Sequence, residues 1–398
     1  MRASLFLLLS ILVVNLAVDW YILRQISSRV KTHRRFWYRT ELWTSVTMVL
    51  LLMTAIIVPA RNGSNHVLLT KMWLLFGYLT VYVPKITAVL FDLIASVPCL
   101  FGHKRIKPIT IIGITIGTAI FLGMWWGALI NRFRTDIREV TIEITDLPES
   151  FDGYRIVQFS DLHTGTYDND TSYVSSLVDD INNLKGDVVV FTGDIVNRES
   201  SELHPFVNVL RRLHASDGVF AILGNHDYGD YMTWDSPADK QRNMENLYSS
   251  LQRSGMDLLR NETRWLRRGN DSIALIGVEN IGDPPFPVYG SLLRAYPTPG
   301  DDVTKILLTH NPAHWTDSIS GHDEIHIPLT LSGHTHAMQI EMMGISPAAL
   351  RYPTWGGLYT DAHEHHQLYV NIGAGTVGMP MRLGATPEIT VITLRRRK

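Results

Sequence analysis

The stretch YRIVQFSDLHTG, residues 154–165, determines the fold expected for the C-terminal part of this 398-residue chain. Its first half, 154–159, is rich in β-branched and aromatic residues, which predicts a buried strand. Its second half places Asp161 and His163 directly after that strand. Open α/β sheets bind ligands at the carboxyl ends of their strands. The stretch therefore predicts a layered fold in which a strand presents polar side chains on a loop.

Four more predicted strands run into polar clusters of the same kind. They end in Thr-Gly-Asp194, Gly-Asn225-His226-Asp227, Thr-His310-Asn311 and Ser-Gly-His334-Thr-His336. Each cluster alone has an ordinary structural explanation, since an Asp often caps a helix and a Gly-Asp pair often forms a turn. Five such clusters are poorly explained as unrelated caps, and loops on a rigid sheet bring distant side chains to one point. We expect convergence of Asp161, His163, Asp194, Asn225, His310, His334 and His336.

The rest of the C-terminal part alternates short β-rich runs with helix-like stretches, which indicates an α/β or α+β layered fold. Strands are predicted at 140–144, 154–159, 187–191, 218–222, 273–278, 305–308, 328–331, 368–371 and 389–394. Helices are predicted at 171–184, 203–213 and 239–254.

The seven converging side chains predict a pair of divalent metal ions. Carboxylate and amide oxygens mixed with imidazoles suit Mn, Fe or Zn, with Mg as a further possibility, and manganese is preferred here. Seven ligands exceed the needs of one ion, so Asp194 is expected to bridge two. Ions about 3.5–4 Å apart share a hydroxide and stabilise charge on phosphoryl oxygens, and no side-chain nucleophile is then required.

With these five blocks in this order, the chain resembles the calcineurin-like metallophosphoesterase superfamily. The resemblance covers about 140–394 and is closest to the membrane-associated or exported bacterial branch, with FDGYRIVQ at 151–158 and PEITVITL at 387–394. It implies a two-sheet sandwich flanked by helices. It also implies hydrolysis of a phosphoric ester or anhydride.

The resemblance also distributes roles among the residues. One metal is expected on Asp161, His163, Asp194 and His336, and the other on Asp194, Asn225, His310 and His334. His226 is then not a ligand but faces the substrate, where it stabilises the transition state or protonates the leaving oxygen. Either Asp227 or Asn197 is expected to orient it, and the sequence does not choose between them.

Some segments depart from the family pattern or extend beyond it. Relatives often continue the last block with Gly-Gly-Gln, whereas this chain has Ala-Met-Gln at 337–339, which predicts a backbone less free to approach a substrate. Residues 228–242 are interpreted as a pocket wall or lid, or equally as a surface insertion.

Two further clusters carry metal-binding or basic side chains. The histidines at 363, 365 and 366 are compatible with a third metal site, but a solvated loop is preferred because only Asp361 and Glu364 accompany them. Arg382 and the basic residues 395–398 suit phosphate or lipid headgroups, with a solvated tail as the preferred interpretation of the terminus.

The N-terminal part, 1–138, is predicted to be a membrane anchor with about four spans, and 139–398 the catalytic domain. Three apolar runs have spanning length, at 5–23, 42–60 and 109–130, and a fourth at 67–100 is interrupted by Lys71, Pro84, Lys85 and Asp92. Lys85 and Asp92 share a helical face and are able to pair with each other or with Asp19, but extension to the membrane interface is preferred. A cleaved signal peptide is the alternative for the first run.

Charge predicts the orientation and restricts the partners. Basic residues gather in the first and third connections, so both are expected in the cytoplasm and the catalytic domain outside it. Residues 1–138 carry 16 Lys/Arg and four Asp/Glu, net +12, whereas 139–398 carry 20 and 34, net −14. An acidic domain disfavours nucleic acid as a partner. The single cysteine, Cys99, excludes an intrachain disulfide.

The sequence thus predicts hydrolysis of a phosphodiester, phosphomonoester or pyrophosphate bond at the membrane surface. A lipid-linked phosphate and a soluble phosphorylated small molecule are both compatible with the residues, and no protein partner is predicted. One alternative is a catalytically silent membrane sensor or scaffold with a metal-binding domain. A nuclease is a further alternative, disfavoured by the negative charge of 139–398.

Overall fold

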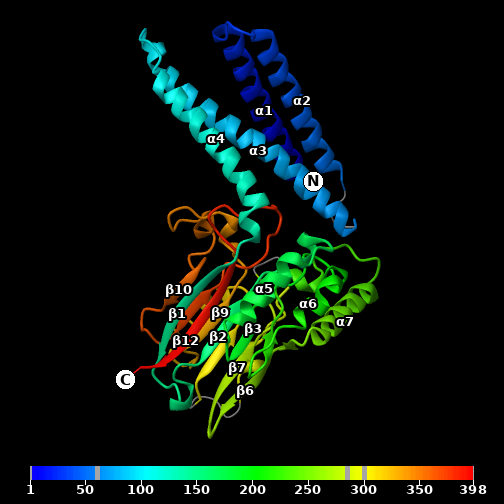
Figure 1. Ribbon diagram of the computed structural model, residues 1–398, viewed down its shortest axis with the longest axis vertical. Helices are drawn as coiled ribbons and strands as arrows, with labels where there is room; N and C mark the ends of the chain where they lie inside the picture. The colour runs from blue at the N-terminus through cyan, green and yellow to red at the C-terminus, as the bar shows by residue number, and fades with distance from the viewer. Residues whose placement is uncertain (1, 59–62, 283–286, 298–302, 398) are drawn as a thin grey trace. The chain divides into compact units, whose positions relative to one another are not determined.

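The computed structural model describes residues 2–58, 63–282, 287–297 and 303–397 (Figure 1), with side chains described from residue 9 onward. The chain divides into two compact units. The first comprises 1–129 and 378–380, and the second comprises 130–377 and 381–398. Each unit has its own architecture.

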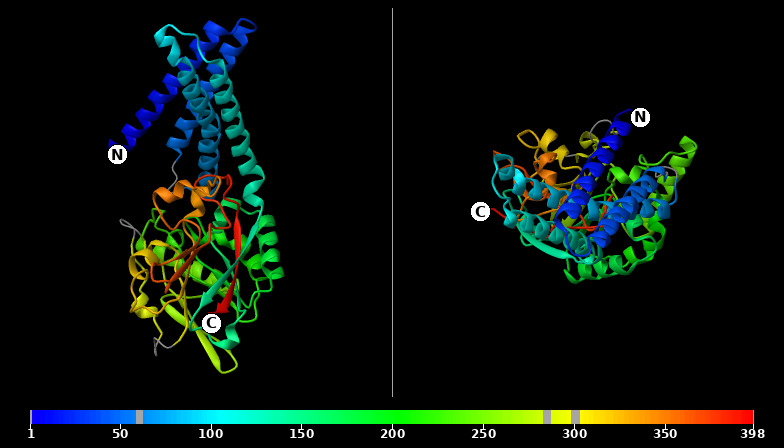
Figure 2. Two further views of the ribbon diagram at one scale, coloured as in Figure 1. Left: turned by 90° about the vertical axis from the view of Figure 1, so that its left-hand side faces the viewer. Right: turned by 90° about the horizontal axis from the view of Figure 1, so that it is seen from above.

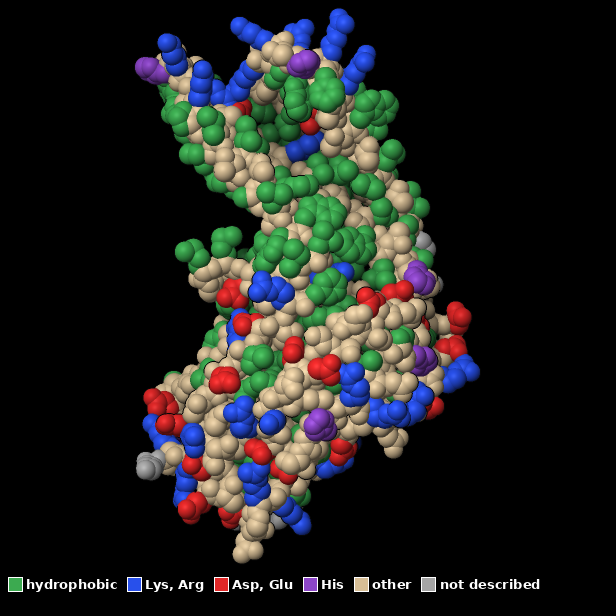
Figure 3. All heavy atoms as spheres, in the orientation of Figure 1, with side chains coloured by type: hydrophobic (Ala, Val, Ile, Leu, Met, Phe, Trp, Pro, Cys, Tyr) green, Lys and Arg blue, Asp and Glu red, His purple; other side chains and the backbone are tan. Residues whose placement is uncertain are grey.

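The first unit contains four long helices. They are α1 Arg2–Arg29, α2 Arg34–Ile57, α3 Asn65–Ser96 and α4 Lys107–Leu129. All four are long and apolar enough to cross a membrane, which confirms the predicted number of spans. The predicted end of the second span, at residue 60, lies outside the described residues. Many large apolar side chains on these helices are exposed, as Figure 3 shows, which suits a surface that faces hydrocarbon.

Helices α3 and α4 pack closely through two glycines. A Cβ on Gly113 would lie 2.3 Å from the Cβ of Phe91, and one on Gly117 would lie 2.9 Å from the carbonyl oxygen of Pro84. Larger side chains are therefore excluded at both positions. Small residues four apart are a common means of bringing membrane helices together.

Lys85 lies in a polar cluster inside the helix bundle. Its Nζ is 3.1 Å from Oδ1 of Asp19 and 2.7 Å from Oε1 of Glu41, and its side chain is only 12% exposed. The Tyr82 hydroxyl donates a further hydrogen bond to Asp19 at 2.7 Å. The expectation that Lys85 reaches the membrane interface is therefore wrong, because neighbouring helices supply its partners.

Asp92 is enclosed by a second set of partners. It accepts a hydrogen bond from the Tyr21 hydroxyl at 2.6 Å and forms ion pairs with Arg29, at 3.2 Å, and with Arg105. Its side chain is 10% exposed. Asp92 and Lys85 thus belong to separate clusters, each with oppositely charged partners from other parts of the bundle.

The second unit contains two six-stranded sheets, and the first has the order β1-β12-β2-β3-β4-β5. Its strands are β1 Asp136–Ile144, β12 Glu388–Arg396, β2 Arg155–Phe159, β3 Val188–Phe191, β4 Val219–Ala221 and β5 Asp257–Leu258. All neighbours are parallel except β12 and β2. The carboxyl ends of β2, β3 and β4 consequently lie at one edge.

The second sheet has the order β10-β11-β9-β8-β7-β6. Its strands are β10 Gly357–Thr360, β11 Gln367–Val370, β9 Leu329–Ser332, β8 Lys305–Leu308, β7 Asp271–Gly277 and β6 Glu262–Arg268. The four central strands are parallel, and the two edge strands are antiparallel to their neighbours. The two sheets confirm the predicted sandwich.

Helices cover the outer faces of the two sheets, so the unit has four layers (Figures 1 and 2). One face of the first sheet packs on α5 Ser172–Asn183, α6 Val207–Leu210 and α7 Pro237–Arg253. The opposite face packs on the second sheet through alternate residues such as Ile156, Val190 and Leu331, as the two-residue period of strands requires. Helices α8 Leu292–Ala295 and α9 Ala313–Ser318 cover the outer face of the second sheet.

Short 3₁₀ helices connect these elements. They are η1 Val97–Phe101, η2 Asn131–Phe133, η3 Glu149–Phe151, η4 Thr164–Tyr167, η5 Ser200–Phe206, η6 Asn225–Tyr228, η7 His336–Gln339 and η8 Pro347–Leu350. The helix predicted at 203–213 is divided into η5 and the one-turn α6, and η5 contains Pro205. Strands β5, β6 and β10 were not predicted.

Candidate metal centre

The seven predicted ligands lie at the carboxyl ends of five strands, on loops that meet. Asp161 and His163 follow β2, Asp194 follows β3, Asn225 opens η6 after β4, His310 follows β8, and His334 and His336 follow β9. Six of them form two groups whose donor atoms lie within 4.8 Å of one another inside each group. Both sheets of the sandwich therefore contribute to one place.

The first group is Asp161, His163 and His336, all buried. The Nε2 atoms of the two histidines are 3.0 Å apart, and Nε2 of His336 is 3.2 Å from Oδ1 of Asp161. Imidazole and carboxylate donors at these separations correspond to neighbouring positions around one divalent ion.

The second group is Asp194, His310 and His334. Nε2 of His310 lies 3.1 Å from Oδ2 of Asp194 and 3.3 Å from Nδ1 of His334. Nδ1 of His310 donates to the carbonyl oxygen of Thr192 at 2.8 Å. This bond fixes the ring and leaves Nε2 as the nitrogen with a lone pair for a metal.

Asp194 lies between the two groups. Its Oδ2 is 3.1 Å from Nε2 of His310 and 3.7 Å from Nε2 of His163. Its Oδ1 accepts a hydrogen bond from the backbone N–H of His226 at 2.8 Å. The carboxylate is thus held in the position that a ligand shared by two ions would occupy.

Asn225 presents an amide whose orientation is fixed. Its Nδ2 donates to the Tyr231 hydroxyl at 2.8 Å, whereas its Oδ1 is buried and accepts no hydrogen bond from any described residue. A buried acceptor without a donor is rare in folded proteins and calls for an explanation. A divalent ion is the partner that fits an amide oxygen beside imidazoles.

The electrostatics of the centre also fit a bound cation. Burial by itself raises the pKa values of Asp161 and Asp194, but the charges of neighbouring histidines outweigh it and leave both pKa values below the ordinary range. Burial lowers the pKa of His310, yet Asp194 beside it raises the net value to about 9. Among the described residues, neither carboxylate forms an ion pair with a lysine or arginine. Two ionised carboxylates faced by imidazoles, which release their protons when a metal binds, fit a divalent cation.

His226 is oriented by the main chain of Asn197. Its Nδ1 donates to the carbonyl oxygen of Asn197 at 2.7 Å, and its ring stacks on Tyr231 with centroids 4.2 Å apart. The side chain of Asn197 instead donates to the Thr166 hydroxyl at 3.3 Å. Of the two residues expected to orient His226, Asn197 makes the contact, through its main-chain carbonyl and not through its side chain.

Asp227 organises the loops beneath the centre. Its carboxylate accepts hydrogen bonds from the backbone N–H groups of Gly224, Asp194, Ile195 and Val196 at 2.9–3.1 Å. Burial raises its pKa to about 7, and the charge of Asp194 adds to the rise. Its oxygens are thus committed to the backbone of two ligand loops, not to the ring of His226.

The ligand loops adopt unusual backbone conformations. Five of the seven predicted ligands have φ between 48° and 78°, namely Asp161, His163, Asp194, His334 and His336. Such left-handed positions cost about 1–3 kcal/mol each and cluster at functional sites. A Cβ on Gly224 would lie 2.2 Å from Oδ1 of Asp194, so only glycine fits against this carboxylate.

The residues after His336 also adopt the left-handed conformation. Ala337, Met338 and Gln339 have φ of 51°, 46° and 60°. The chain thus takes the conformation that glycine favours although two glycines are replaced, and the expectation that this backbone is less free to approach a substrate stays a prediction.

Two tyrosines line a small cavity at the centre. The cavity of about 70 Å³ is bounded by Asn225, Tyr231, His334 and Tyr352 among others. The Tyr352 hydroxyl lies 2.9 Å from Nε2 of His334. Residues 228–242 thus contribute a pocket wall through Tyr231, as one of the two interpretations expected. No motif in the sequence distinguished Tyr352.

Arg382 lies behind His336 and is fully buried. Its Nη2 is 3.1 Å from Nδ1 of His336, and its guanidinium donates to the carbonyl oxygens of Ile372, Gly375 and Ala385. The suggestion that it holds phosphate or lipid headgroups is wrong, because its donors are used inside the fold.

Comparison with known proteins gives two family matches. Residues 1–132 match the model described as "Probable Calcineurin-like phosphoesterase, transmembrane domain", and residues 154–338 match "Calcineurin-like phosphoesterase". The second match includes all seven predicted ligands.

Three relatives illustrate the range of similar proteins. "Uncharacterized metallophosphoesterase YkuE" of Bacillus subtilis is 34% identical over 69% of this chain and 90% of its own length. "Transmembrane protein with metallophosphoesterase domain" of Danio rerio is 33% identical over 65% of this chain, which spans 57% of that relative. "Uncharacterized metallophosphoesterase Cj0846" of Campylobacter jejuni is 25% identical over 99% of both chains.

Proposed function

The chain belongs to the calcineurin-like phosphoesterases, and we propose that its metal centre is dinuclear and acts on a phosphoric ester or anhydride linked to a lipid. The family and the metal-binding residues establish a metal-dependent phosphohydrolase, and the four helices with their family match establish a membrane protein. The observation that carries the dinuclear proposal is the place of Asp194 Oδ2 between two separate donor groups.

Each ion has its own donor set in this proposal. Asp161, His163 and His336 hold the first ion, and His310, His334 and Asn225 hold the second, with Asp194 shared. When bound, the two ions supply a hydroxide nucleophile and positive charge for the phosphoryl oxygens. Manganese is the proposed ion, since mixed oxygen and imidazole ligands suit it.

His226 is proposed to protonate the leaving oxygen. Its Nδ1–H is used by the carbonyl oxygen of Asn197, so Nε2 is the ring nitrogen left for a substrate. Stacking on Tyr231 fixes the plane of the ring. In its imidazolium form the ring also carries a proton on Nε2, which it would give to the leaving oxygen while Nδ1–H keeps its bond to Asn197.

The lipid part of the proposal is supported by an exposed apolar segment that begins six residues after His336, the last of the predicted ligands. Met342, Met343, Ile345 and Leu350 are 67%, 96%, 72% and 93% exposed. Exposed apolar side chains gathered in one short segment are a common feature of membrane and ligand contact sites. The segment begins only a few residues after His336, so an alkyl chain bound along it would place its phosphate near the centre.

The length of the connection between the units supports a membrane substrate as well. Helix α4 ends at Leu129 and β1 begins at Asp136. Only six residues intervene, so the chain that carries the metal centre follows a membrane helix through a short covalent link. We place this unit on the extracytoplasmic side, because the basic connections predict that orientation.

The experiment uses purified full-length protein in detergent with Mn²⁺. Aryl phosphodiesters and phosphomonoesters test the reaction, and phosphate esters with the same headgroup but long or short acyl chains test the lipid proposal. We expect turnover that EDTA abolishes and a preference for the long chain. Failure to hydrolyse any phosphoric ester with any divalent ion, in a folded sample, would contradict the catalytic proposal.

A matched pair of variants separates the lipid proposal from catalysis. Met343→Gln with Ile345→Gln removes apolar surface from the exposed segment, whereas Leu293→Gln removes an apolar side chain that is 90% exposed elsewhere. The double variant should lose about tenfold in kcat/KM for the long-chain substrate only, as the loss of roughly 1.4 kcal/mol of apolar contact would give. Equal activity of all three proteins on the long-chain ester would exclude a role for the segment.

A further inference from the structure

A third cluster of metal-binding side chains lies apart from the seven residues of the centre. It comprises Asp323, His363 and His365, whose donor atoms lie within 4.8 Å of one another. Asp323 belongs to the loop between α9 and β9, and the histidines belong to the turn between β10 and β11. We propose that these three residues bind one transition-metal ion of the zinc type.

The distances within the cluster suit a single ion. Oδ1 of Asp323 is 3.0 Å from Nδ1 of His363 and 3.2 Å from Nδ1 of His365. Ligands about 2.0–2.1 Å from a tetrahedral zinc ion lie about 3.3 Å from each other. Two imidazoles with one carboxylate favour zinc or a similar transition metal over calcium or magnesium.

The two loops that carry these ligands are tied together by Asp361. Its Oδ1 accepts hydrogen bonds from the backbone N–H groups of His365 and His366 at 2.9 and 3.2 Å, and its Oδ2 accepts one from Gly321 at 3.4 Å. Asp361 N also donates to the carbonyl oxygen of His366 at 3.0 Å, closing the turn. The ligand positions are therefore set before an ion binds.

The backbone between the two histidines is in the left-handed conformation. Glu364 has φ of 57°, a position that costs a residue with a side chain about 1–2 kcal/mol. Both neighbouring imidazoles approach the same oxygen of Asp323 as a result. An unfavourable conformation that brings two ligands together is a mark of a functional turn.

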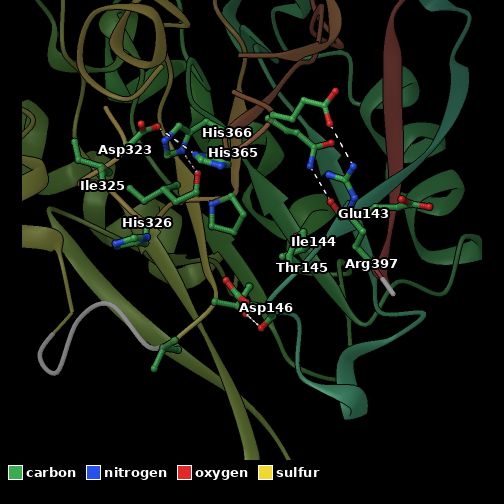
Figure 4. A pocket seen from close by; sticks show the side chains of 16 residues that line it. Glu143, Ile144, Thr145, Asp146, Asp323, Ile325, His326, His365, His366 and Arg397 are labelled. Carbon is green, nitrogen blue, oxygen red and sulfur yellow. Dashed lines mark hydrogen bonds and ion pairs between the residues drawn. The ribbon is translucent and has the colours of Figure 1, made fainter. Parts of the chain in front are cut away.

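The cluster stands at the rim of a cavity of about 550 Å³. Figure 4 shows Asp323, His365 and His366 on one side of this cavity and Glu143 and Arg397 on the other. His366 is buried and its Nε2 has no hydrogen-bond partner among the described residues. Three protein donors leave one position of a tetrahedral ion open, and the exposure of the cluster gives a fourth ligand access to it.

Sequence reasoning preferred a solvated loop here because no acidic partner was evident beyond Asp361 and Glu364. The structure supplies Asp323, which lies forty residues before His363 in the chain. Glu364 is engaged with Arg397 at 3.3 Å. An ion at this cluster would join the β10–β11 turn to the loop before β9.

The experiment counts bound zinc in full-length protein in detergent after equilibrium dialysis. Wild type is compared with His363→Ala/His365→Ala and with the control His322→Ala. His322 is an exposed histidine one residue before Asp323, and it pairs with Glu324 at 3.1 Å. We expect the double variant to bind one zinc ion fewer than wild type and His322→Ala to bind the same number.

The difference between the variants is independent of how many ions the phosphoesterase centre holds. A second measurement follows Tm on addition of Zn²⁺ after saturation with Mn²⁺, where wild type and His322→Ala should rise more than the double variant. Equal zinc stoichiometry and equal Tm shifts in all three proteins would overturn the proposal. The distances in the cluster would then reflect only hydrogen bonds from the two imidazoles to Asp323.

Discussion

The two units of this protein bury charge in different ways. In the helix bundle the buried carboxylates are neutralised by the protein itself, as Asp19 is by Lys85 and Asp92 is by arginines. In the second unit Asp161 and Asp194 are equally buried but face histidines and, among the described residues, pair with no lysine or arginine. A buried charge needs a partner. Where the chain supplies only imidazoles, which give up their protons to bind a metal, the buried carboxylates fit a metal ion.

Glu202 shows a third way to bury a carboxyl group, in which the group keeps its proton up to about neutral pH. It is buried in the second unit, where its Oε2 accepts a hydrogen bond from the backbone N–H of Asn197 at 2.5 Å. Arg198 is its nearest cation, at 3.8 Å. Burial raises the pKa of Glu202 to about 7, although these neighbours lower it. Neutralisation by a proton avoids the cost of an unpaired buried charge.

The largest effect is expected from Asp194→Ala, which removes the carboxylate between the two donor groups. Loss of a shared ligand should lower kcat by at least about 10³-fold, because metal ions contribute several kcal/mol to transition-state stabilisation. The measurement is Mn²⁺-dependent hydrolysis of an aryl phosphodiester, with circular dichroism as a control for folding. Activity within tenfold of wild type would mean that Asp194 is not needed to hold the ions. The contrast between the buried carboxylates of the two units would then fail.

In the bundle, Lys85→Met leaves Asp19 and Glu41 without their cation. The free energy of unfolding should fall by about 3–5 kcal/mol, as when one partner of a buried ion pair is removed. Denaturant unfolding in mixed micelles measures it. Adding Asp19→Asn and Glu41→Gln in the same protein should restore most of the stability. An unchanged free energy of unfolding in Lys85→Met would mean that water solvates the carboxylates of Asp19 and Glu41 in the folded protein.

Glu202→Gln tests the neutralisation by a proton. A carboxyl whose folded pKa is raised stabilises the fold below the unfolded pKa of 4.5, and this contribution is lost as pH rises through about 7. Relative to the variant, wild type should therefore lose about 3 kcal/mol between pH 4.5 and pH 8, from a shift of about 2.5 units. The comparison is made by Tm at constant metal concentration. A difference in Tm that stays constant across this pH range would show that folding does not raise the pKa of Glu202.

The smallest effect is expected from removal of metal by EDTA. Ions present at 100 times their Kd stabilise the folded state by about 2.7 kcal/mol, so chelation should lower the Tm of wild type. Asp194→Ala should respond much less, because its ion binding is already weakened. An identical fall in Tm in the two proteins would mean that the stabilising ion does not bind at Asp194. The same measurement on His363→Ala/His365→Ala would then test whether the third cluster holds that ion.

The strand ends could be predicted from the sequence because their signals are local. A central strand such as β3 is an apolar run, and its ligand Asp194 comes three residues after the strand ends. The convergence of five loops follows from the parallel order of strands in a sheet. Three of the spans were evident from hydropathy, and the fourth, at 67–100, was predicted despite the charges and the proline within it.

The missed features depend on contacts that sequence patterns do not carry. Strand β6, ETRWLRR, is a polar edge strand whose pairing with β7 is visible only in three dimensions. The Tyr352 hydroxyl reaches His334 from a loop 18 residues away, and Asp323 reaches His363 from 40 residues away. His226 is oriented by a main-chain carbonyl, which every residue possesses and no motif reveals.

The pairing of β1 with β12 imposes an order on biogenesis. These strands are parallel neighbours from Asp136 with Glu388 to Ile144 with Arg396, and β12 separates β1 from β2. Until residues 388–396 have left the ribosome, the strand that follows the membrane helices has no partner in the sheet. Completion of the first sheet must therefore await synthesis of β12, and a nonsense mutation near codon 388 would leave an inserted anchor carrying an unfinished, aggregation-prone domain.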